Sequence, residues 1–416
     1  MTNICLVAYG GGHAAMLVPV IKVLKQNENI KLSVLALTTA GSVMENHNID
    51  YVSYKDFTYL ADESFAEKGS FLVGEQSASS VISYDESVAY HGINYLDLVE
   101  QYGEVEASNK YKLLGRQAFY PINFMKCLLT ELDVDLLIAT NSPRTERAAI
   151  DAAGELQLKS LCLIDMFALQ EVKWVGKKGY ASKLCVLNQS VKDMFLDVGR
   201  SANEIEITGN PAFDSLTSIA TISSGKQLKE ARGWHESNLI TLFYASQPEP
   251  SQHPFTSLSG DPELPRNIEN TLREFVSKHT RFRLVIRYHP SENVEFTAQE
   301  RVLFSPQEDN LHSLLYGVDI VVVTASTVGL EASLIGKKVI SVDNSIFTDD
   351  APFSRMGISE GVTEAKELEK KILDVSQNLD TQVEHIQYLN STGNVVKVVE
   401  RLIFEMKCSS KISSVN

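Results

Sequence analysis

The segment at residues 319–343 constrains the fold of this chain more than any other stretch. It holds an uninterrupted apolar run at 320–323, a hydroxyl-rich turn at 324–327 and a second apolar run at 338–342. Short runs rich in β-branched residues are typical of strands buried on both faces of a parallel sheet, and parallel neighbours need a crossover, usually a helix. The segment therefore predicts a strand–helix–strand unit with the turn at the carboxyl end of its first strand.

The turn places Ser326 and Thr327 at the start of the predicted helix. The first turn of a helix presents unpaired N–H groups and the positive end of its dipole, so it favours an anion such as phosphate. Glu331 lies one turn further on, where a carboxylate could accept hydrogen bonds from a ribose. This pattern resembles the nucleotide-binding segment of the GT-B glycosyltransferases and the related UDP-N-acetylglucosamine 2-epimerases. An ordinary strand–helix unit with a Ser or Thr N-cap would show the same residues.

A second motif, His289-Pro290, follows a predicted strand at 282–286. Proline fixes the turn that aims the imidazole, and a phosphate nearby would favour the protonated ring. Together with the hydroxyl-rich turn, it resembles the HP and S(S/T) motif pair of bacterial sialyl-, polysialyl- and Kdo-transferases. The resemblance implies that both motifs hold the phosphate of a CMP-sugar. A surface histidine in a turn is the alternative for His289 taken alone.

The chain begins with an apolar strand at 3–8, a glycine-rich turn that includes Gly11 and Gly12, and His13 at the start of an amphipathic helix. Glycines at the first strand–helix turn let a backbone approach a ligand closely. The pattern resembles the GGGxGGH opening of the MurG-type glycosyltransferases. It is not GxGxxG, so a dinucleotide-binding dehydrogenase fits poorly. His13 faces either a ligand or merely the start of its helix.

Composition excludes several classes of protein. A chain of 416 residues exceeds what one core usually holds, so two domains are expected. The net charge of −15 argues against a nucleic-acid partner, which needs clustered Lys and Arg. Five scattered cysteines without CxxC spacing indicate a reducing compartment and no structural zinc. We see no signal peptide and no transmembrane segment, which predicts a cytoplasmic protein and leaves room for peripheral association with membrane-bound assembly machinery.

Strand and helix patterns alternate along the first half of the chain, which predicts a parallel sheet covered by helices on both faces. Strands are expected at 3–8, 31–37, 134–139, 160–165, 183–186 and 204–208, and helices at 14–25, 93–107, 120–131, 145–156 and 190–197. The polar stretch 57–91 breaks the rhythm and is interpreted as a loop insertion that sets acceptor specificity. A TGNP turn at 208–211 marks a domain boundary.

The second half restarts after a Ser/Thr/Gly-rich segment at 215–225. Strands are expected at 239–244 and 282–286 in addition to those of segment 319–343, and helices at 268–278, 311–316, 364–379 and 382–406. The resemblance implies a GT-B fold, with two Rossmann-like α/β domains, a cleft between them and a C-terminal helix that crosses back. Residues 1–214 would form the acceptor-side domain with 386–416 packed on it, and 215–385 would form the nucleotide-sugar-binding domain.

In open α/β sheets ligands bind at the carboxyl ends of strands. The nucleotide should therefore lie on the second domain, and its predicted contacts are Ser246, Gln247, His289, Pro290, Ser326, Thr327 and Glu331, with Gly11 and Gly12 approaching from the first domain. An inverting transferase also needs a base for the acceptor hydroxyl.

Asp165 ends a first-domain strand, and its place resembles that of the base motif of bacterial sialyltransferases, although no glycine follows it. A helix cap or turn former would also place an Asp there. His13 is the second candidate for the base. The acidic residues Asp62, Glu63 and Glu86 of the insertion have no assigned register.

The 2-epimerases carry a His-Arg-x-Glu-Asn signature after the first strand of their second domain, where this chain has Ser246-Gln247-Pro248-Glu249. Their Ser-Gly-Gly-x-x-Glu-Glu loop is also altered here. The leading prediction is therefore an inverting glycosyltransferase without a metal or other cofactor, which uses a CMP-sugar (nonulosonic acid or Kdo) or a UDP-sugar. Its acceptor would be a glycan of capsule or lipopolysaccharide. A UDP-N-acetylhexosamine 2-epimerase-like isomerase or hydrolase and a non-catalytic GT-B scaffold are the alternatives.

Overall fold

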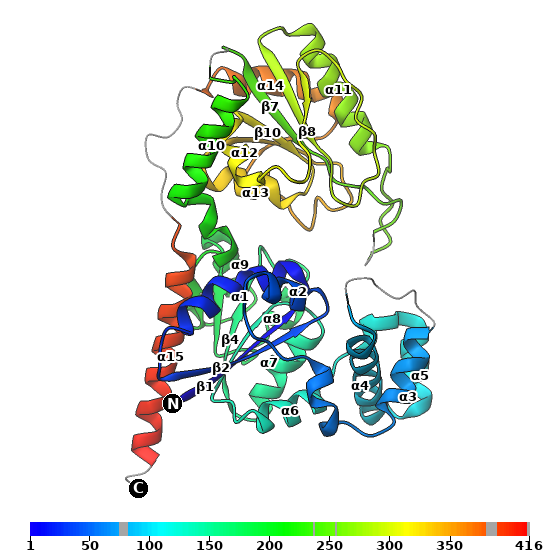
Figure 1. The fold of residues 1–416 in the computed structure, drawn as a ribbon, viewed down its shortest axis with the longest axis vertical. Coiled ribbons are helices and arrows are strands. Elements are labelled where there is room, and N and C mark those ends of the chain that lie inside the picture. The colour runs from blue at the N-terminus through cyan, green and yellow to red at the C-terminus, as the bar shows by residue number, and fades with distance from the viewer. Residues whose placement is uncertain (75–81, 236–237, 254–255, 380–388, 414–416) are drawn as a thin grey trace. The chain divides into compact units, whose positions relative to one another are not determined.

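The chain folds into two compact α/β units, each built on its own parallel sheet of six strands (Figure 1). The computed structural model describes residues 1–74, 82–235, 238–253, 256–379 and 389–413. Unit 1 comprises Met1–Ala212 and Asn390–Asn416, and unit 2 comprises Phe213–Leu389. This pair of doubly covered parallel sheets confirms the predicted α/β GT-B fold class. The predicted boundary at 385/386 lies outside the described residues.

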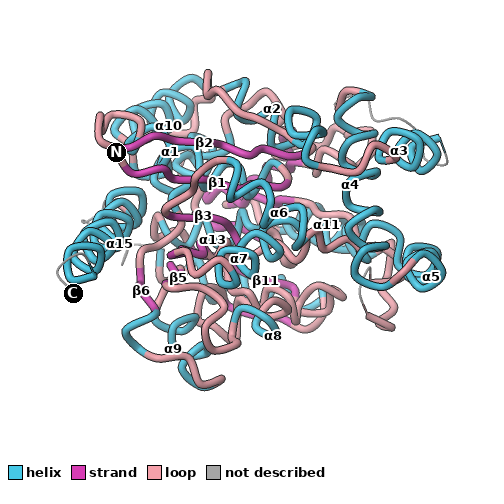
Figure 2. The backbone as a smooth tube through the Cα atoms, turned by 90° about the horizontal axis from the view of Figure 1, so that it is seen from below, coloured by secondary structure: helices cyan, strands magenta, loops and turns pink. Residues whose placement is uncertain are grey.

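In unit 1 the strands lie in the order β2-β1-β3-β4-β5-β6, and every pair is parallel. Figure 2 shows β1 between β2 and β3. Their bounds are β1 Thr2–Tyr9, β2 Ile30–Leu37, β3 Leu136–Thr140, β4 Lys159–Leu163, β5 Lys183–Val186 and β6 Ile205–Ile207. All six strand predictions are confirmed to within about two residues at each end. Because β2 and β3 lie on opposite sides of β1, the strand order reverses at β1. Open α/β sheets bind ligands at such a switch point, at the carboxyl ends of the strands.

Helices cover both faces of the first sheet. Those with contacts to the sheet or to each other include α1 Gly11–Leu24, α2 Thr39–Asn46, α6 Ile122–Glu131, α7 Thr145–Glu155 and α9 Gln189–Asp197, with the short α8 at Val172–Val175. The apolar stripe of α1 enters one hydrophobic core with β1 and β2, while α7 contacts β1, β3 and β4. The burial of these stripes accounts for the fold of unit 1 around its central strands.

The stretch 57–91 was predicted to be an irregular loop, and that prediction is wrong. A 3-10 helix at Tyr54–Leu60 leads to α3 Phe65–Gly74 and α4 Tyr84–Tyr102, and residues 75–81 lie outside the described part. The two helices touch through glycines: a Cβ on Gly69 would lie 2.1 Å from the Val88 carbonyl oxygen. Small residues at this contact replace the apolar residues that would have revealed a helical period.

The single helix predicted at 93–107 is instead two helices. Gly103, with φ of 78°, ends α4, and α5 Glu104–Leu114 starts directly after it. Glycine adopts this left-handed conformation without the steric cost that a side chain would add. A short 3-10 turn at Gly115–Ala118 then leads toward α6.

The second sheet has the order β12-β11-β10-β7-β8-β9 and is also fully parallel. Its bounds are β7 Ile240–Ala245, β8 Phe282–Arg287, β9 Val302–Phe304, β10 Ile320–Val323, β11 Lys338–Val342 and β12 Glu360–Val362. The four strands predicted here are confirmed. The sequence missed β9 and β12, the two edge strands, because three residues are too few to establish a period.

Unit 2 is covered by α10 Ile219–Ala231, α11 Leu264–Lys278, α12 Leu311–Gly317, α13 Thr327–Leu334 and α14 Leu368–Ser376. The Ser/Thr/Gly-rich segment expected at 215–225 is not a connection, since α10 begins there with Ser218 as its N-cap. Gly225 explains this outcome: a Cβ there would lie 2.4 Å from the Cβ of Tyr316, so glycine allows α10 to pack closely on α12. The sheet, α11 and α14 share one hydrophobic core.

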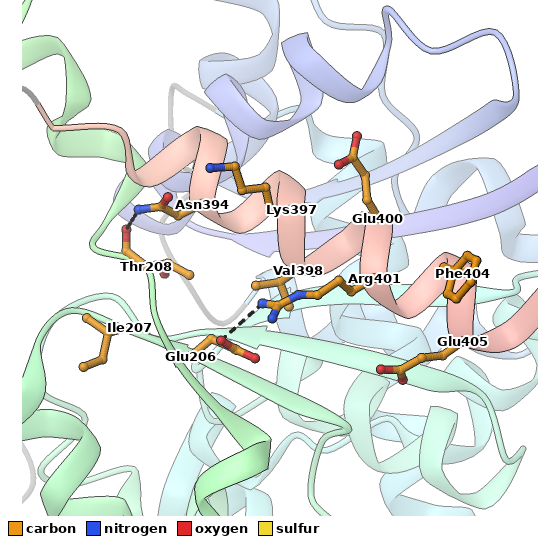
Figure 3. Close-up of a pocket in the computed structure, with 10 residues that line it drawn as sticks. All are labelled: Glu206, Ile207, Thr208, Asn394, Lys397, Val398, Glu400, Arg401, Phe404 and Glu405. Atoms are coloured by element: carbon orange, nitrogen blue, oxygen red, sulfur yellow. Dashed lines mark hydrogen bonds and ion pairs between the residues drawn. The ribbon is translucent and has the colours of Figure 1, made fainter.

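The last helix, α15 Ser391–Ser413, returns to unit 1, as predicted for a helix that crosses back. Its valines enter the same core as α1. Asn394 Nδ2 donates to the Thr208 carbonyl at 3.4 Å, and Arg401 lies 3.2 Å from Glu206 (Figure 3). The predicted start of this helix at 382 falls outside the described residues.

Candidate functional site

The second sheet carries the predicted nucleotide contacts on one edge. Strands β10, β7 and β8 are neighbours, and Ser326, Gln247 and His289 follow their respective carboxyl ends. Because the strands are parallel, these ends lie on the same edge of the sheet. Thr324 Oγ1 donates to Gln247 Oε1 at 3.5 Å, which ties the β10 turn to the β7 turn. The structure therefore brings together residues that lie far apart in the sequence.

Helix α13 begins at this edge with Ser326 as its N-cap. The Ser326 Oγ accepts the Val328 N–H at 3.4 Å, so the capping interpretation of this serine is confirmed. Thr327 is exposed at the first helical position. Of the N–H groups that follow it, that of Val328 donates to Ser326 Oγ and that of Gly329 to the Ser326 carbonyl at 3.0 Å, so the exposed donors at this helix start are those of Thr327 itself. A Cβ on Gly329 would lie 2.8 Å from Val323 Cγ2, so glycine is needed for α13 to start this close to β10.

His289 is exposed at the edge and is held by its neighbours. Its Nδ1 lies 2.7 Å from Ser291 Oγ and accepts the Ser291 N–H at 3.2 Å. With Nδ1 as the acceptor, the neutral ring carries its proton on Nε2, which is then a donor. The His289 N–H in turn donates to Glu292 Oε2 at 2.8 Å. Pro290 is exposed beside it.

A charged network that the sequence did not predict supports the β7 and β8 turns. Arg266 of α11 donates to Ser246 Oγ at 2.8 Å and to Glu292 Oε1 at 2.9 Å, and Ser246 Oγ donates to the same carboxylate at 2.9 Å. Ser246 is buried and fully engaged in these bonds. It therefore holds the frame of the edge, whereas Gln247 is the better placed of the pair for a ligand.

Glu331 lies in α13 as expected, but it is buried and faces a partner that the sequence did not reveal. His312 Nε2 of α12 lies 3.1 Å from Glu331 Oε2, and Ser215 Oγ lies 3.3 Å from the other ring nitrogen. A ribose contact by Glu331 therefore stays a prediction, and it would share the carboxylate with His312.

The first sheet carries a different group of residues at the switch point beside β1. Gly10, with φ of 88°, turns the chain from β1 into α1, and Gly11 and Gly12 form the first turn of that helix. His13 is the third residue of α1, so it lies on the helix and does not cap it. Its Nδ1 is buried and makes no hydrogen bond of normal geometry with the described residues.

Glu146, which sequence reasoning missed, lies beside His13. It is fully buried in the first turn of α7, and its Oε1 accepts the Tyr9 N–H at 2.7 Å and the Thr140 hydroxyl at 3.2 Å. Burial raises the pKa of this carboxyl, an effect that the charge of His13 partly opposes. Its Oε2 has no hydrogen bond of normal geometry to the described residues. The available signal was an acid in the first turn after a predicted strand end.

Aromatic and cationic groups contact Tyr9, whose N–H donates to Glu146. The Arg144 guanidinium carbon lies 4.5 Å from the centre of the Tyr9 ring, a cation–π distance. Tyr9 in turn packs against the buried Tyr90 of α4, with ring centres 5.7 Å apart. Arg144 brings a positive charge to the switch point. The helices of the 57–91 stretch thus reach the ligand-binding end of the sheet.

Asp165 follows β4 on the same edge and is half-buried. Asn141 and Asp165 form a reciprocal pair: Asn141 Nδ2 donates to Asp165 Oδ1 at 3.1 Å, and the Asp165 N–H donates to Asn141 Oδ1 at 3.0 Å. The Met166 N–H donates to the same Oδ1 at 2.7 Å. These bonds fix the turn, and Oδ2 is the oxygen left for a substrate. Of the other acids, Asp62 accepts the Ser64 N–H at 2.9 Å, while Glu86 is buried.

Two kinds of feature are absent from the described residues. No group of three or more His, Cys, Asp or Glu side chains is arranged to hold a metal ion. No described helix combines the length and the apolar character that a bilayer crossing requires. An open groove of about 690 Å³ between β6 and α15 (Figure 3) contains none of the predicted site residues among those that line it.

No protein-family model matches the chain, and no curated protein matches it. Solved structures, in contrast, do match the chain. The UDP-GlcNAc 2-epimerase of Neisseria meningitidis bound to UDP-GlcNAc is 14% identical with a TM-score of 0.61, and the match covers 97% of this chain and 100% of that one. The UDP-GlcNAc 2-epimerase of Methanocaldococcus jannaschii is 12% identical with a TM-score of 0.57, covering 96% and 100%.

The MurG of Acinetobacter baumannii is 14% identical with a TM-score of 0.53, and the match covers 96% of this chain and 100% of that one. A structural similarity at identities this low shows a shared fold and does not show a shared activity. The chain thus has the fold that these nucleotide-sugar enzymes share.

Proposed function

We propose that the chain is a nucleotide-sugar-dependent enzyme, and specifically an inverting glycosyltransferase that needs no metal. The observation that carries the proposal is the carboxyl edge of the second sheet. There the exposed start of α13, the Nε2 of His289 and the side chain of Gln247 offer donors to an anion from three adjacent strands. A nucleotide phosphate is the anion that this fold commonly receives at a helix N-terminus.

The same groups would serve the reaction. As the acceptor oxygen bonds to the anomeric carbon, the bond from that carbon to the phosphate oxygen breaks and the phosphate gains charge. Donors fixed before the reaction stabilise this charge without reorganising, and a helix N-terminus is such a donor set. Ser326 and Thr327 supply hydroxyls beside those N–H groups. The donor would be a CMP-sugar or a UDP-sugar.

The acceptor hydroxyl must lose its proton to a base on unit 1. Asp165 offers Oδ2, since its other oxygen is bound by Asn141 and Met166. His13 is the competing base, and Glu146 beside it would stabilise the charged ring after it takes the proton. The acceptor would be a glycan of a bacterial surface polysaccharide.

An epimerase-like reaction on a UDP-N-acetylhexosamine is the second candidate, because the solved structures similar to this chain include several UDP-GlcNAc 2-epimerases. The region after β7 argues for the transferase instead. Glu249 is buried and accepts the Ser345 hydroxyl and the Ile346 N–H, both at 2.7 Å, so it anchors a loop. Ser246, which replaces the first histidine of the epimerase signature, is also engaged in the frame.

One experiment separates these functions. The protein is screened by thermal shift against CMP, UDP, GDP and dTDP, and the matching nucleotide-sugar is then incubated with and without glycan acceptors in EDTA. Transfer that persists in EDTA supports the proposal. A 2-epimer formed without acceptor supports the epimerase, and nucleotide binding without turnover supports a scaffold. Stabilisation by none of the four nucleotides contradicts both enzyme functions.

A further inference from the structure

Unit 1 contains a second polar pocket, at the carboxyl end of β2 and outside the site described above. Its volume is about 190 Å³, which is room for about six water molecules. The end of β2, the first turns of α2 and α4 and the segment 51–55 form its walls. Most of its polar lining is hydroxyl: Thr38, Ser42, Tyr51, Ser53 and Ser83.

A buried carboxylate lines this pocket without a settled partner. Glu86 is only 7% exposed, and neither of its oxygens makes a hydrogen bond of normal geometry with the described residues. Burial raises the pKa of this carboxyl, while the nearby Ser53 hydroxyl and Lys55 N–H offset part of the effect. The Ser53 hydroxyl, the Lys55 N–H and the Lys55 charge therefore act on Glu86 without bonding it in normal geometry, and a buried acceptor in this state is stabilised when a ligand supplies well-aligned donors.

The N-terminus of α4 is capped by a residue other than Glu86. Ser83 already caps the helix by accepting the Glu86 N–H at 3.3 Å, and this bond does not use the Glu86 carboxylate. Asp56 provides a contrast nearby, because its carboxylate accepts the Ser53 N–H at 2.7 Å and the Ser53 hydroxyl at 3.3 Å. Thr38 has φ of 55°, a strained backbone for a β-branched residue, and such strain gathers at binding sites.

We propose that this pocket binds one sugar ring of the acceptor glycan, with the two oxygens of Glu86 accepting hydrogen bonds from adjacent ring hydroxyls. A carboxylate has two acceptor oxygens side by side, which suits a pair of neighbouring hydroxyl donors, and the hydroxyl lining suits the remaining polar groups of a sugar. The inference rests on the proposed transferase function.

The position of the pocket fits that role. β2 pairs with β1 in register up to Leu37 and Tyr9, so the pocket and the His13 turn lie at neighbouring strand ends. Tyr90, one turn after Glu86 on α4, packs against Tyr9, whose N–H is bound by Glu146. A sugar held at Glu86 is thereby placed on the edge that carries the candidate bases.

Saturation-transfer NMR on the full chain tests the pocket with glucose, galactose, mannose, N-acetylglucosamine, N-acetylgalactosamine and N-acetylmannosamine as probes. We expect at least one sugar to bind, and Glu86→Gln to weaken it by about tenfold or more. Asp85→Asn is the matched control, because Asp85 lies in the same first turn but is exposed, and it should leave binding unchanged. Silence from all six sugars, or equal binding by Glu86→Gln, overturns the proposal.

Two companion measurements separate this proposal from its alternatives. Calorimetry with CMP and UDP on the same variants reports the nucleotide site of unit 2, so a failure there counts against the proposed function and leaves the sugar result to stand by itself. The melting temperature at pH 7 reports a structural role. Glu86→Gln should melt no lower than Asp85→Asn, and a loss of several degrees relative to that control would make Glu86 a structural residue and overturn the inference.

Discussion

The carboxyl ends of the strands in the two sheets differ in how far their polar side chains are hydrogen-bonded. On unit 2 most of these side chains satisfy one another: Ser246, Arg266 and Glu292 bond to each other, and Glu249 is doubly bound, whereas Glu331 has only His312 beside its buried oxygen within the described part of the chain. On unit 1, Glu146 and His13 keep buried polar atoms without hydrogen bonds of normal geometry to the described residues. The polar groups on unit 2 are therefore mostly held by hydrogen bonds within the protein, whereas unit 1 keeps buried polar atoms that a ligand could bind.

Most of the carboxyl groups whose pKa departs from its ordinary value follow the same division, and Asp62 of unit 1 is the exception, since its hydrogen bonds with Ser64 lower its pKa. The carboxyl groups of Glu86, Asp97 and Glu146, which burial raises in pKa, all belong to unit 1. In unit 2 the shifted carboxyl groups are Glu367 and Glu369, and hydrogen bonds lower the pKa of both. A frame of satisfied donors suits the binding of a charged phosphate, whereas raised carboxyl pKa values suit proton transfer. The difference supports the proposal that unit 2 binds the phosphate and that unit 1 supplies the base.

The largest expected effect is on the rate of sugar transfer. Asp165→Asn keeps the shape of the side chain but cannot accept a proton, so transfer should fall by about 10²–10⁴ while nucleotide affinity stays within a fewfold. Steady-state kinetics with the donor found by the nucleotide screen measures it. His13→Ala is the matched competitor. If His13→Ala is the slow variant and Asp165→Asn is normal, the base belongs to the pair with Glu146, and unimpaired transfer in both would remove the base from this edge.

A second prediction concerns stability and pH in unit 1. Burial raises the pKa of Asp97 from 3.8 to about 6, so its folded state holds a proton more tightly than the unfolded state does. The stability from this group is therefore complete below pH 4 and lost as pH rises through about 6. Between pH 4 and pH 7, Asp97→Asn should gain up to about 3 kcal/mol relative to the unchanged protein.

The slope with pH isolates the titration, because the hydrogen bond that Asp97→Asn loses to Phe124 or Gln101 changes stability by an amount that does not vary with pH. Hydrogen exchange of α4 and α6 reports unit 1 by itself when the two proteins are compared at each pH. Parallel stability curves across this range would show that Asp97 is not desolvated as described.

A smaller effect is expected at Glu331. Its carboxylate is buried in unit 2, much as those of Glu86 and Glu146 are buried in unit 1. If Glu331 binds a ribose, Glu331→Gln should weaken a ribonucleotide by about tenfold and a 2′-deoxyribonucleotide much less. Calorimetry with both nucleotides checks this. His312→Gln is the control, since it removes the ion-pair partner and keeps the carboxylate. Equal losses for both nucleotides would assign Glu331 to its pair with His312 alone.

The sequence predicted the strands well because buried parallel strands are short apolar runs, as at 320–323 and 338–342. It failed where packing overrides composition: Gly69 lets α3 touch α4, and Gly225 lets the polar α10 pack against α12. The turns that carry His289 and Ser326 could be predicted from strand ends. Glu146 could not be paired with the first turn, because its partner Tyr9 lies 137 residues away and only the sheet order joins them.

The central claim, that unit 2 holds the nucleotide and unit 1 performs the chemistry, is tested most directly by nucleotide affinity in matched variants. Isothermal titration with the preferred nucleotide should show that His289→Ala and Ser326→Ala each bind about tenfold more weakly or worse, because each loses a donor to the phosphate. Asp165→Asn and Glu146→Gln should bind within a fewfold of the unchanged protein. Unchanged affinity in the first pair, or a tenfold loss in the second, would contradict this division of labour.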